Sequence, residues 1–546
     1  MEFEIIINNY PLKVSKGDTI LTAARKNGIK IPVLCNWPEL SPTGACRLCV
    51  VEIKGTPDLV PACSTPVSEG MIIQTHSLKV IKARKNLVSL LLANHPEDCL
   101  YCAQNGSCEL QDIANSLNIR ERYFTDKYKD QKTDRTDPSM ILDMTKCILC
   151  GRCVRICKEI AKVSALEFIG RGKNMKVEPV FKKGLYYSPC IHCGKCIVAC
   201  PTAAISEKSV LNQISEKIDS SDTLCSISLS PSTIAWFSAN YNIKKYEDTK
   251  AFLVAALIHV GFKTVNTNSF GIEVFISEET KKVQTRLDDF KIPYIITDCP
   301  AAKTFIKNHV PDLKQFLCKI YTPQYITGTN IKKQSEANTI HTAVAPCVSL
   351  KHAAANDYLD SNSKPTCDFV ISSLELDKLL RSYGISLPYA NKEIASTFSA
   401  YDTSSGALFE TKGGISETIL RNLFAINNEN QKTPKKIFDN RSDKDFMEYE
   451  FQLNNKTYKI ASINGTDCLL ENKEVILNSN YLFIEFRSCK HACISGCGNS
   501  LKNDFDLWKK LKKVISDYDD ANHNSNVSQN QFIKGLYKEN KNEDLI

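Results

Sequence analysis

The stretch Cys147-Ile148-Leu149-Cys150-Gly151-Arg152-Cys153-Val154-Arg155-Ile156-Cys157 spaces four cysteines as C-x2-C-x2-C-x3-C. The same spacing returns in Cys190-Ile191-His192-Cys193-Gly194-Lys195-Cys196-Ile197-Val198-Ala199-Cys200, directly before Pro201. This is the ligand run of bacterial ferredoxins with two 4Fe–4S cubanes, in which the fourth cysteine of each run binds the other cubane. Structural zinc sites also use C-x2-C pairs, but they do not account for two tight four-cysteine runs. The spacing therefore predicts two cubanes, one on Cys147, Cys150, Cys153 and Cys200, and one on Cys190, Cys193, Cys196 and Cys157.

Two further ligand sets precede these runs. The first is a four-thiolate set of 2Fe–2S type, formed by Cys35, Cys46, Cys49 and Cys63. Residues 3–7 and 10–14 predict a β-hairpin across two asparagines, and residues 19–24 open a helix, so we expect a β-grasp ferredoxin domain over residues 1–78.

The second set has one imidazole and three thiolates, from His95, Cys99, Cys102 and Cys108. A lone histidine is usually an ordinary surface residue, but the position of His95 just before three cysteines favours a ligand. We expect this set to hold a 4Fe–4S cluster in a mostly helical module over residues 79–137. A neutral ligand in place of a thiolate raises the cluster's potential.

Composition indicates a large chain in a reducing compartment. The chain has 546 residues, 24 of them cysteine, and 43% are hydrophobic, which is unlike a small secreted disulfide scaffold. We therefore expect a cytoplasmic location. The N-terminus predicts no signal peptide, and no apolar run is long enough to span a membrane. The net charge of +8 is spread along the chain, which predicts no nucleic-acid partner.

The remaining chain predicts two more domains. We assign residues 138–208 to the two-cubane domain and residues 222–546 to one large unit. In that unit, β-rich runs at 223–229, 272–276, 294–297, 342–345 and 369–372 alternate with helical runs. Such alternation is typical of a parallel sheet covered by helices, so we expect a multidomain α/β and α+β protein. Lysine-rich residues 507–513 predict an amphipathic helix, and residues 517–546 a partly disordered tail.

Three motifs of the large unit resemble the catalytic domain of the FeFe (iron-only) hydrogenases, and the whole chain resembles their long form with accessory clusters. Ile296-Thr297-Asp298-Cys299-Pro300 stands where the family has T-S-C-C-P, and Ala345-Pro346-Cys347 where it has M-P-C. Glu485-Phe486-Arg487-Ser488-Cys489-x3-Cys493 stands where it has E-x-M-A-C-x3-C. Segments 367–376 and 405–414 also match.

The resemblance implies that four cysteines hold a fourth cubane: Cys299, Cys347, Cys489 and Cys493. In the family, the last of these also bridges to a diiron subcluster that carries CO and cyanide. The chain would then hold one 2Fe–2S and four 4Fe–4S clusters, with about 18 iron atoms if every cluster fills.

Around the diiron position the sequence departs from the family. Asp298 replaces the thiol that donates protons; a carboxylic acid could relay them only if burial raised its pKa. Leu350 replaces the lysine that pairs with cyanide, Lys351 lies one place later, and Arg487 replaces a methionine. The final glutamate of the relay segment becomes Lys282. Further departures are Ala345, His491, Ala492 and the added Cys497. The pocket candidates that remain are Ser230, Pro231, Ser232, Gln324 and Lys351.

A site that retains the cubane cysteines but replaces residues around the diiron position is compatible with two functions. In the first, the chain is an electron-transfer subunit of a hetero-oligomer, with a flavin- or NAD(P)-binding subunit or a ferredoxin as its electron partner. In the second, it is a working hydrogenase that interconverts protons and dihydrogen. We favour the first, because several groups changed together. A third possibility, the large iron–sulfur subunit of a respiratory NADH dehydrogenase, shares the first 200 residues but does not account for the cysteines of the three hydrogenase-like motifs.

Overall fold

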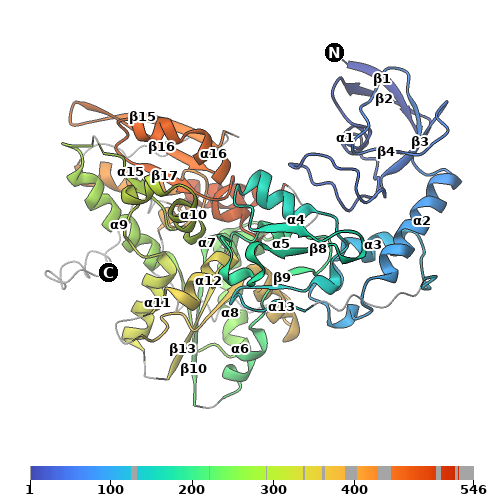
Figure 1. Ribbon diagram of the computed structural model, residues 1–546. Coiled ribbons are helices and arrows are strands. Elements are labelled where there is room, and N and C mark those ends of the chain that lie inside the picture. Colours follow the sequence, from blue (N-terminus) through green and yellow to red (C-terminus); the bar gives the residue numbers. More distant parts are fainter. Residues whose placement is uncertain are drawn as a thin grey trace. The chain divides into compact units, whose positions relative to one another are not determined.

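The computed structural model describes residues 2–124, 132–220, 222–290, 292–335, 338–359, 363–387, 403–427, 444–499, 506–522 and 527. Backbone contacts divide the chain into two compact units. The first contains Met1–Ser188 and Lys195–Glu207, and the second contains Pro189–Gly194 and Lys208–Ile546. Figure 1 colours the first unit from blue to cyan-green and most of the second from green to red.

The first unit begins with a five-stranded sheet in the order β2-β1-β5-β3-β4. The predicted hairpin is confirmed: β1 pairs antiparallel with β2, and Asn8 and Asn9 adopt the positive φ angles that tight hairpin turns need. The predicted helix is also confirmed as α1, and the Thr19 hydroxyl caps it by accepting from Thr22 N. The elements are β1 (Glu2–Ile7), β2 (Tyr10–Ser15), α1 (Ile20–Lys26), β3 (Val50–Ile53), β4 (Val60–Pro61) and β5 (Ile72–Gln74).

The rest of the first unit consists of short helices and two antiparallel strand pairs, β6–β9 and β7–β8. The longest helix, α2, starts at the Ser77 cap. The elements are α2 (Leu78–Ala93), α3 (Glu109–Ser116), β6 (Met140–Leu142), α4 (Arg152–Arg155), β7 (Leu166–Ile169), β8 (Lys176–Pro179), α5 (Lys195–Ala199) and β9 (Ile205–Glu207).

The second unit contains a parallel sheet in the order β11-β10-β13-β14, of which Figure 1 labels β10 and β13. Its strands are β10 (Leu224–Leu229), β11 (Thr264–Thr267), β13 (Thr339–Ala345) and β14 (Phe369–Ser372). A core of buried apolar residues joins this sheet to several helices, among them α7 (Pro231–Asn240), α8 (Tyr246–Val260), α13 (Ser373–Ser382) and α18 (Leu507–Ala521). The predicted strands 223–229, 342–345 and 369–372 are confirmed. So is the amphipathic helix near residue 507, and the first residues of the predicted partly disordered tail, 517–521, form the end of this helix. Apart from Asn522 and Val527, the remainder of that tail lies outside the described residues.

A second sheet has the order β12-β17-β16-β15, with β15 antiparallel to β16. Its strands are β12 (Ile295–Ile296), β15 (Phe446–Leu453), β16 (Lys456–Asn464) and β17 (Ile484–Arg487). The predicted strand at 272–276 is wrong, since these residues lie inside the helix α9 (Ser269–Thr285). Eleven of the helix's 17 residues are buried, so its apolar run reflects burial on most sides rather than strand geometry. The helix α15 (Gly414–Asn427) packs with α9 in the same core.

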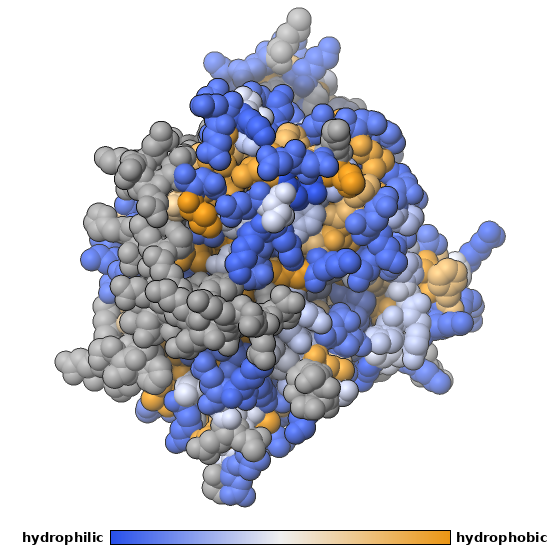
Figure 2. Space-filling model, turned by 90° about the vertical axis from the view of Figure 1, so that its left-hand side faces the viewer, coloured by the Kyte–Doolittle hydropathy of each residue, from blue (hydrophilic) through white to orange (hydrophobic). Residues whose placement is uncertain are grey.

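In the coloured part of Figure 2 hydrophilic residues predominate, and hydrophobic residues form small separate patches between them. Within the described residues, no helix has the length and apolar character needed to cross a membrane. The remaining described helices of the second unit are α6 (Leu211–Ile218), α10 (Pro300–His309), α11 (Pro323–Gln334), α12 (Val348–Asn356), α14 (Ser404–Leu408), α16 (Thr466–Glu471), α17 (Lys473–Asn478) and the short 3-10 helices η7 (Pro311–Phe316) and η10 (Ala492–Ser495).

Candidate metal centres

The structure brings together the thiols of the N-terminal set, Cys35, Cys46, Cys49 and Cys63. Hydrogen bonds from the thiols of Cys46 and Cys63 lower the pKa of Cys35, and a hydrogen bond from Cys63 lowers the pKa of Cys49 to about 7. Behind this loop, the buried Arg84 side chain donates to Leu48 O at 2.9 Å and to Val50 O at 2.8 Å. The four thiols are linked by hydrogen bonds, and the arginine holds the loop that carries two of them. They form a donor set suited to a 2Fe–2S cluster.

The His95 set is built around a network of charged groups. Burial lowers the pKa of His95, which favours the neutral imidazole that a metal ligand needs. Arg122 donates to His95 O at 2.6 Å, and Lys146 pairs with Asp98 at 3.0 Å. Lys146 is also close enough to Cys102 for that thiolate to raise its pKa, though burial opposes the shift. The histidine and this thiol therefore share a cationic neighbour.

The first cubane set also converges. Burial raises the pKa of the Cys153 thiol well above its usual value, and the negative charges of Cys150, Cys200 and Cys147 raise it further. The spacing of the run thus places these sulfurs within electrostatic reach of Cys153. Four thiols this close together form a donor set suited to a 4Fe–4S cluster.

Both cysteine runs use the same backbone device. In each run, two residues have positive φ, the one before the second cysteine and the glycine after it: Leu149 (54°), Gly151 (74°), His192 (54°) and Gly194 (71°). This conformation aims a backbone N–H at the first sulfur of the run, at 3.4 Å for Cys147 and 3.3 Å for Cys190. Successive N–H groups turned inward form an anion-binding concavity, which suits an anionic iron–sulfur cluster. Of the cysteines predicted to bind the second cubane, Cys157 and Cys196 belong to the first unit, and Cys190 and Cys193 belong to the second.

The fourth set lies at the ends of three strands of the second unit. Cys299 caps α10 just after β12, Cys347 caps α12 after β13, and Cys489 follows β17. Burial raises the pKa of Cys347 well above its usual value, and the charges of Cys497, Cys299 and Cys489 raise it further. Cys493, in η10, responds in the same way to burial and to the charge of Cys299. The structure therefore gathers Cys299, Cys347, Cys489 and Cys493 at one place.

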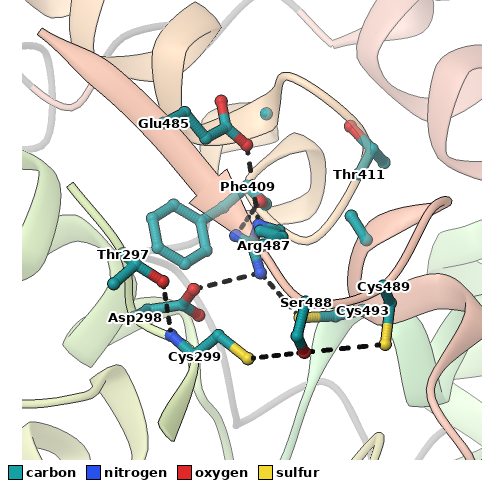
Figure 3. A network of polar contacts seen from close by, with 12 residues as sticks. Thr297, Asp298, Cys299, Phe409, Thr411, Glu485, Arg487, Ser488, Cys489 and Cys493 are labelled. Atoms are coloured by element: carbon teal, nitrogen blue, oxygen red, sulfur yellow. Dashed lines mark hydrogen bonds and ion pairs between the residues drawn. The ribbon is translucent and has the colours of Figure 1, made fainter. Parts of the chain in front are cut away.

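Glycines let the loops that carry these cysteines pack closely. A Cβ atom on Gly496 would lie 2.3 Å from Pro346 O, which is closer than any side chain tolerates. Gly498 N donates to the same carbonyl at 2.8 Å. The segments around Cys347 and Cys493 are thereby locked together. Ser488 lies between two of the sulfurs, at 3.4 Å from Cys299 Sγ and 4.0 Å from Cys489 Sγ (Figure 3).

The central feature of this pocket is the guanidinium of Arg487, which Figure 3 shows among the four groups that surround it. Its Nη1 donates to Cys493 Sγ at 2.6 Å and lies 3.0 Å from Asp298 Oδ1. Its Nη2 donates to Phe409 O at 2.7 Å, and its Nε lies 3.6 Å from Glu485 Oε1. Only 1% of the side chain is exposed, so this is a buried charge cluster.

The charges of the cluster explain how an arginine is held there. Burial by itself would lower the pKa of Arg487, but Asp298, then Cys493 and Glu485, raise it above its ordinary value. Burial raises the pKa of Glu485, while Arg487 and the backbone N–H of Ser416, which donates at 2.9 Å, oppose that rise. The guanidinium is therefore a fixed cation beside the sulfur of Cys493.

The other pocket candidates lie on elements around this cluster. Ser230 caps α7 and Pro231 is its first residue, while Ser232 N donates to Glu410 Oε2 at 2.8 Å. Gln324 is buried at the start of α11, and its Oε1 accepts no hydrogen bond within the described residues.

Lys351 forms an ion pair of its own. Its Nζ bonds to Glu375 Oε2 at 2.7 Å, and both side chains are buried. Leu350 belongs to a small apolar core with Ala343, Ala353 and Val370. The position of the family's cyanide-pairing lysine is thus apolar, and the displaced lysine is neutralised.

On α9, the segment that aligns with the family's relay segment contains a buried glutamate held by two polar partners. Glu279 is fully buried, accepts from Tyr294 Oη at 2.6 Å and pairs with Lys282 at 3.2 Å. Burial raises the pKa of Glu279, and both partners oppose that rise. Cys318, whose thiol donates to Thr297 O at 3.3 Å, lies between this cluster and the segment of Cys299. The sequence had not pointed to Cys318, because it belongs to none of the family motifs.

The comparisons with known proteins agree with this architecture. The family described as "Iron only hydrogenase large subunit, C-terminal domain" matches residues 224–497. The chain is 30% identical to iron hydrogenase 1 of Clostridium pasteurianum, over 93% of this chain and 91% of that protein. The chain belongs to the iron-only hydrogenase family.

Three further family matches cover the N-terminal region. They are described as a 2Fe-2S iron-sulfur cluster binding domain (residues 1–77), an NADH-ubiquinone oxidoreductase-G iron-sulfur binding region (84–122) and an NADH-quinone oxidoreductase subunit 3 ferredoxin-like domain (137–206). This iron-only hydrogenase family member therefore carries both 2Fe–2S and 4Fe–4S binding domains.

Two other relatives extend the comparison. The chain is 28% identical to the NADP-reducing hydrogenase subunit HndD of Solidesulfovibrio fructosivorans, over 98% of this chain and 95% of that protein. Among solved structures, the FeFe-hydrogenase HydA1 from Chlamydomonas reinhardtii aligns with a TM-score of 0.51 at 17% identity, covering 61% of this chain and 94% of that one. At that identity the likeness concerns the fold, which is the fold expected from the three motifs.

Proposed function

We propose that this chain is an iron–sulfur electron-transfer subunit of the iron-only hydrogenase family in which the diiron centre is lost. The clusters, when bound, would carry single electrons along the chain. The residues that would hold them are the five sets described above, with Cys299, Cys347, Cys489 and Cys493 at the buried end. The proposal differs from a working hydrogenase only at that last set.

One observation carries the proposal: the 2.6 Å hydrogen bond from Arg487 Nη1 to Cys493 Sγ. In the family this sulfur bridges the cubane to the diiron subcluster. Here a permanently charged guanidinium lies against it, fixed by Asp298, Glu485 and the carbonyl of Phe409. If the guanidinium moved away, the carboxylates of Asp298 and Glu485 would stay buried without a counter-charge, which is costly in free energy. It would therefore cap the sulfur and exclude a second metal unit.

The groups that would serve proton chemistry are engaged elsewhere. Asp298, at the position of the proton-donating thiol, forms an ion pair with Arg487. Glu279 is held between Tyr294 and Lys282. Both carboxylates are thus engaged in fixed ion pairs or hydrogen bonds. This supports a pocket that does not pass protons.

The electron partner would approach the N-terminal cluster domains. All 24 cysteines lie in the described residues, and Cys99 is the one that is exposed. Its neighbours Leu100 and Tyr101 are 84% and 92% exposed, which is unusual for large apolar side chains next to a cluster ligand. The relative HndD is named as a subunit of an NADP-reducing hydrogenase. We propose a flavin- or NAD(P)-binding subunit or a ferredoxin as the partner, in a hetero-oligomer.

The test is a set of pocket variants made with the diiron maturation machinery present. Wild type, Asp298→Cys and Arg487→Lys should all fail to evolve dihydrogen from reduced viologen, because a cation still lies beside Cys493. The triple variant Asp298→Cys, Leu350→Lys, Arg487→Met restores the family's residues and is the one expected to gain any activity. Robust turnover by the wild type would favour the working hydrogenase instead.

A further inference from the structure

A cavity of about 980 Å³ lies in the second unit, between α10, the segment that follows it and α12. Pro300 lines it, and Pro300 is bonded to Cys299, the first cysteine of the buried set. Cys318 also lines it, and the Cys318 thiol donates to Thr297 O at 3.3 Å. One wall of the cavity is therefore the outer side of the segment that carries Cys299.

The rim of the cavity is positively charged. Lys307, Lys314 and Lys319 line it and are exposed, and in the part of the chain that the structure describes none of them lies within ion-pair distance of a carboxylate. Of the two aspartates in the lining, Asp312 is paired with Lys473, which leaves Asp357. Unpaired ammonium groups around a hollow attract anions, and lysine binds phosphate as a point charge.

An aromatic platform lies beside these lysines. Tyr321 lines the cavity, is 45% exposed and stacks on Tyr325 with 4.1 Å between ring centroids. The Tyr325 hydroxyl donates to Leu359 O at 3.2 Å, which fixes the supporting ring. The exposed ring is thus held rigid from one side, as a surface on which a second planar ring can stack.

We propose that this cavity binds a phosphate-bearing planar aromatic compound, a mononucleotide, with its phosphate on the lysines and its ring on Tyr321. The volume lies within the range of small-molecule sites, and the remaining lining is mostly apolar, including Leu317 and Ile320. The position beside Cys299, in a domain of redox proteins, makes flavin mononucleotide the first probe. This site goes beyond the proposed function and does not depend on whether a diiron centre is present.

The test is a fluorescence titration of flavin mononucleotide with the full chain, purified anaerobically with its clusters. Lys307→Glu and Lys319→Glu should each weaken binding about 10- to 100-fold, because each replaces a charge-assisted phosphate contact by repulsion. Riboflavin, which lacks the phosphate, should bind more weakly than flavin mononucleotide by a similar factor. Lys459→Glu is the matched control, since Lys459 is an exposed lysine on β16 outside the cavity, and it should leave binding unchanged.

A second pair of variants tests the platform. Tyr321→Ala should weaken binding about tenfold, as loss of an aromatic stacking contact does, whereas Tyr321→Phe should retain it. Competition by adenosine monophosphate would show that the site takes mononucleotides in general, within the proposal. Equal binding of riboflavin and flavin mononucleotide, or equal effects of Lys307→Glu and Lys459→Glu, would overturn it. So would the absence of any saturable binding. None of these readouts depends on dihydrogen chemistry, so this proposal and the loss of the diiron centre can fail separately.

Discussion

Replacing Arg487 by methionine, the residue that the family has at this position, tests the charge cluster directly. In the structure the guanidinium is 1% exposed, and the carboxylates of Asp298 and Glu485 are 8% and 0% exposed. These values place the cluster among buried ion pairs, not among surface pairs worth about 0 to 1 kcal/mol. Removing one partner of a buried pair typically costs about 3 to 5 kcal/mol, because charge is left buried without compensation.

The expected result is a clear loss of thermal stability in Arg487→Met. The second unit comprises Pro189–Gly194 and Lys208–Ile546, so at about 2.1 cal/mol/K per residue each kcal/mol moves its melting temperature by only about 1.4 °C, and the loss should be about 4–7 °C. Intrinsic fluorescence can follow it, since Trp236 and Trp508 lie in the second unit. Arg381→Met removes an exposed guanidinium, 66% accessible, and should change the melting temperature little.

The loss should depend on pH in a defined direction. Burial raises the pKa of Glu485 in the folded protein above its unfolded value, and Arg487 opposes that rise. A carboxyl with a raised folded pKa loses stability as pH rises from the unfolded pKa through the folded pKa. Without Arg487 the folded pKa of Glu485 is higher still, so the pH range over which stability is lost extends further upward. Arg487→Met should therefore be more destabilising at pH 8 than at pH 6. Adding Glu485→Gln should restore part of the loss. A melting temperature equal to that of Arg381→Met at both pH values would refute the reasoning.

Three further predictions concern the clusters and their use. Cys150→Ala and Cys193→Ala should each lose one 4Fe–4S cluster while the 2Fe–2S signal in electron paramagnetic resonance stays intact. Zinc instead of iron and sulfide in the wild type would contradict the proposed electron transfer through clusters. Cys46→Ser should slow electron exchange with a flavoprotein or ferredoxin partner, and an unchanged rate would move the entry point to another cluster. Asp298→Cys alone should not raise hydrogen evolution from reduced viologen, although a restored general acid is typically worth about 100- to 10,000-fold, because Arg487 would still cap Cys493.

The sequence predicted the parts of the fold that short-range chemistry determines. Asn8-Asn9 between two β-rich runs and Thr19 before a helix both had the expected structure. The strands β10, β13 and β14 were also predicted, because a buried parallel strand is a continuous apolar run. The apolar run 272–276 was assigned wrongly as a strand, since a short run of β-branched and aromatic residues does not distinguish a strand from a buried helix. The antiparallel pair β15–β16 had not been predicted at all.

The candidate site was predictable in its residues but not in its contacts. Motif order identified Cys299, Cys347, Cys489 and Cys493, and it marked Arg487 as a departure. That this arginine lies against Cys493 Sγ, and that Lys351 has its own partner in Glu375, depends on side-chain placement between elements far apart in the chain. Cys497, which is close enough to Cys347 to raise its pKa, had been noted only as an added cysteine.

The measurement that tests the central claim most directly is an infrared spectrum of the full chain, produced with the diiron maturation machinery and purified anaerobically. Iron and sulfide analysis of the same sample establishes that the cubanes are filled. The loss of the diiron centre predicts no intrinsic CO or cyanide bands in that sample, and none in Arg487→Lys. Such bands in the wild-type protein, with dihydrogen evolution that rises with their intensity, would contradict the account and make the chain a working hydrogenase with an altered pocket.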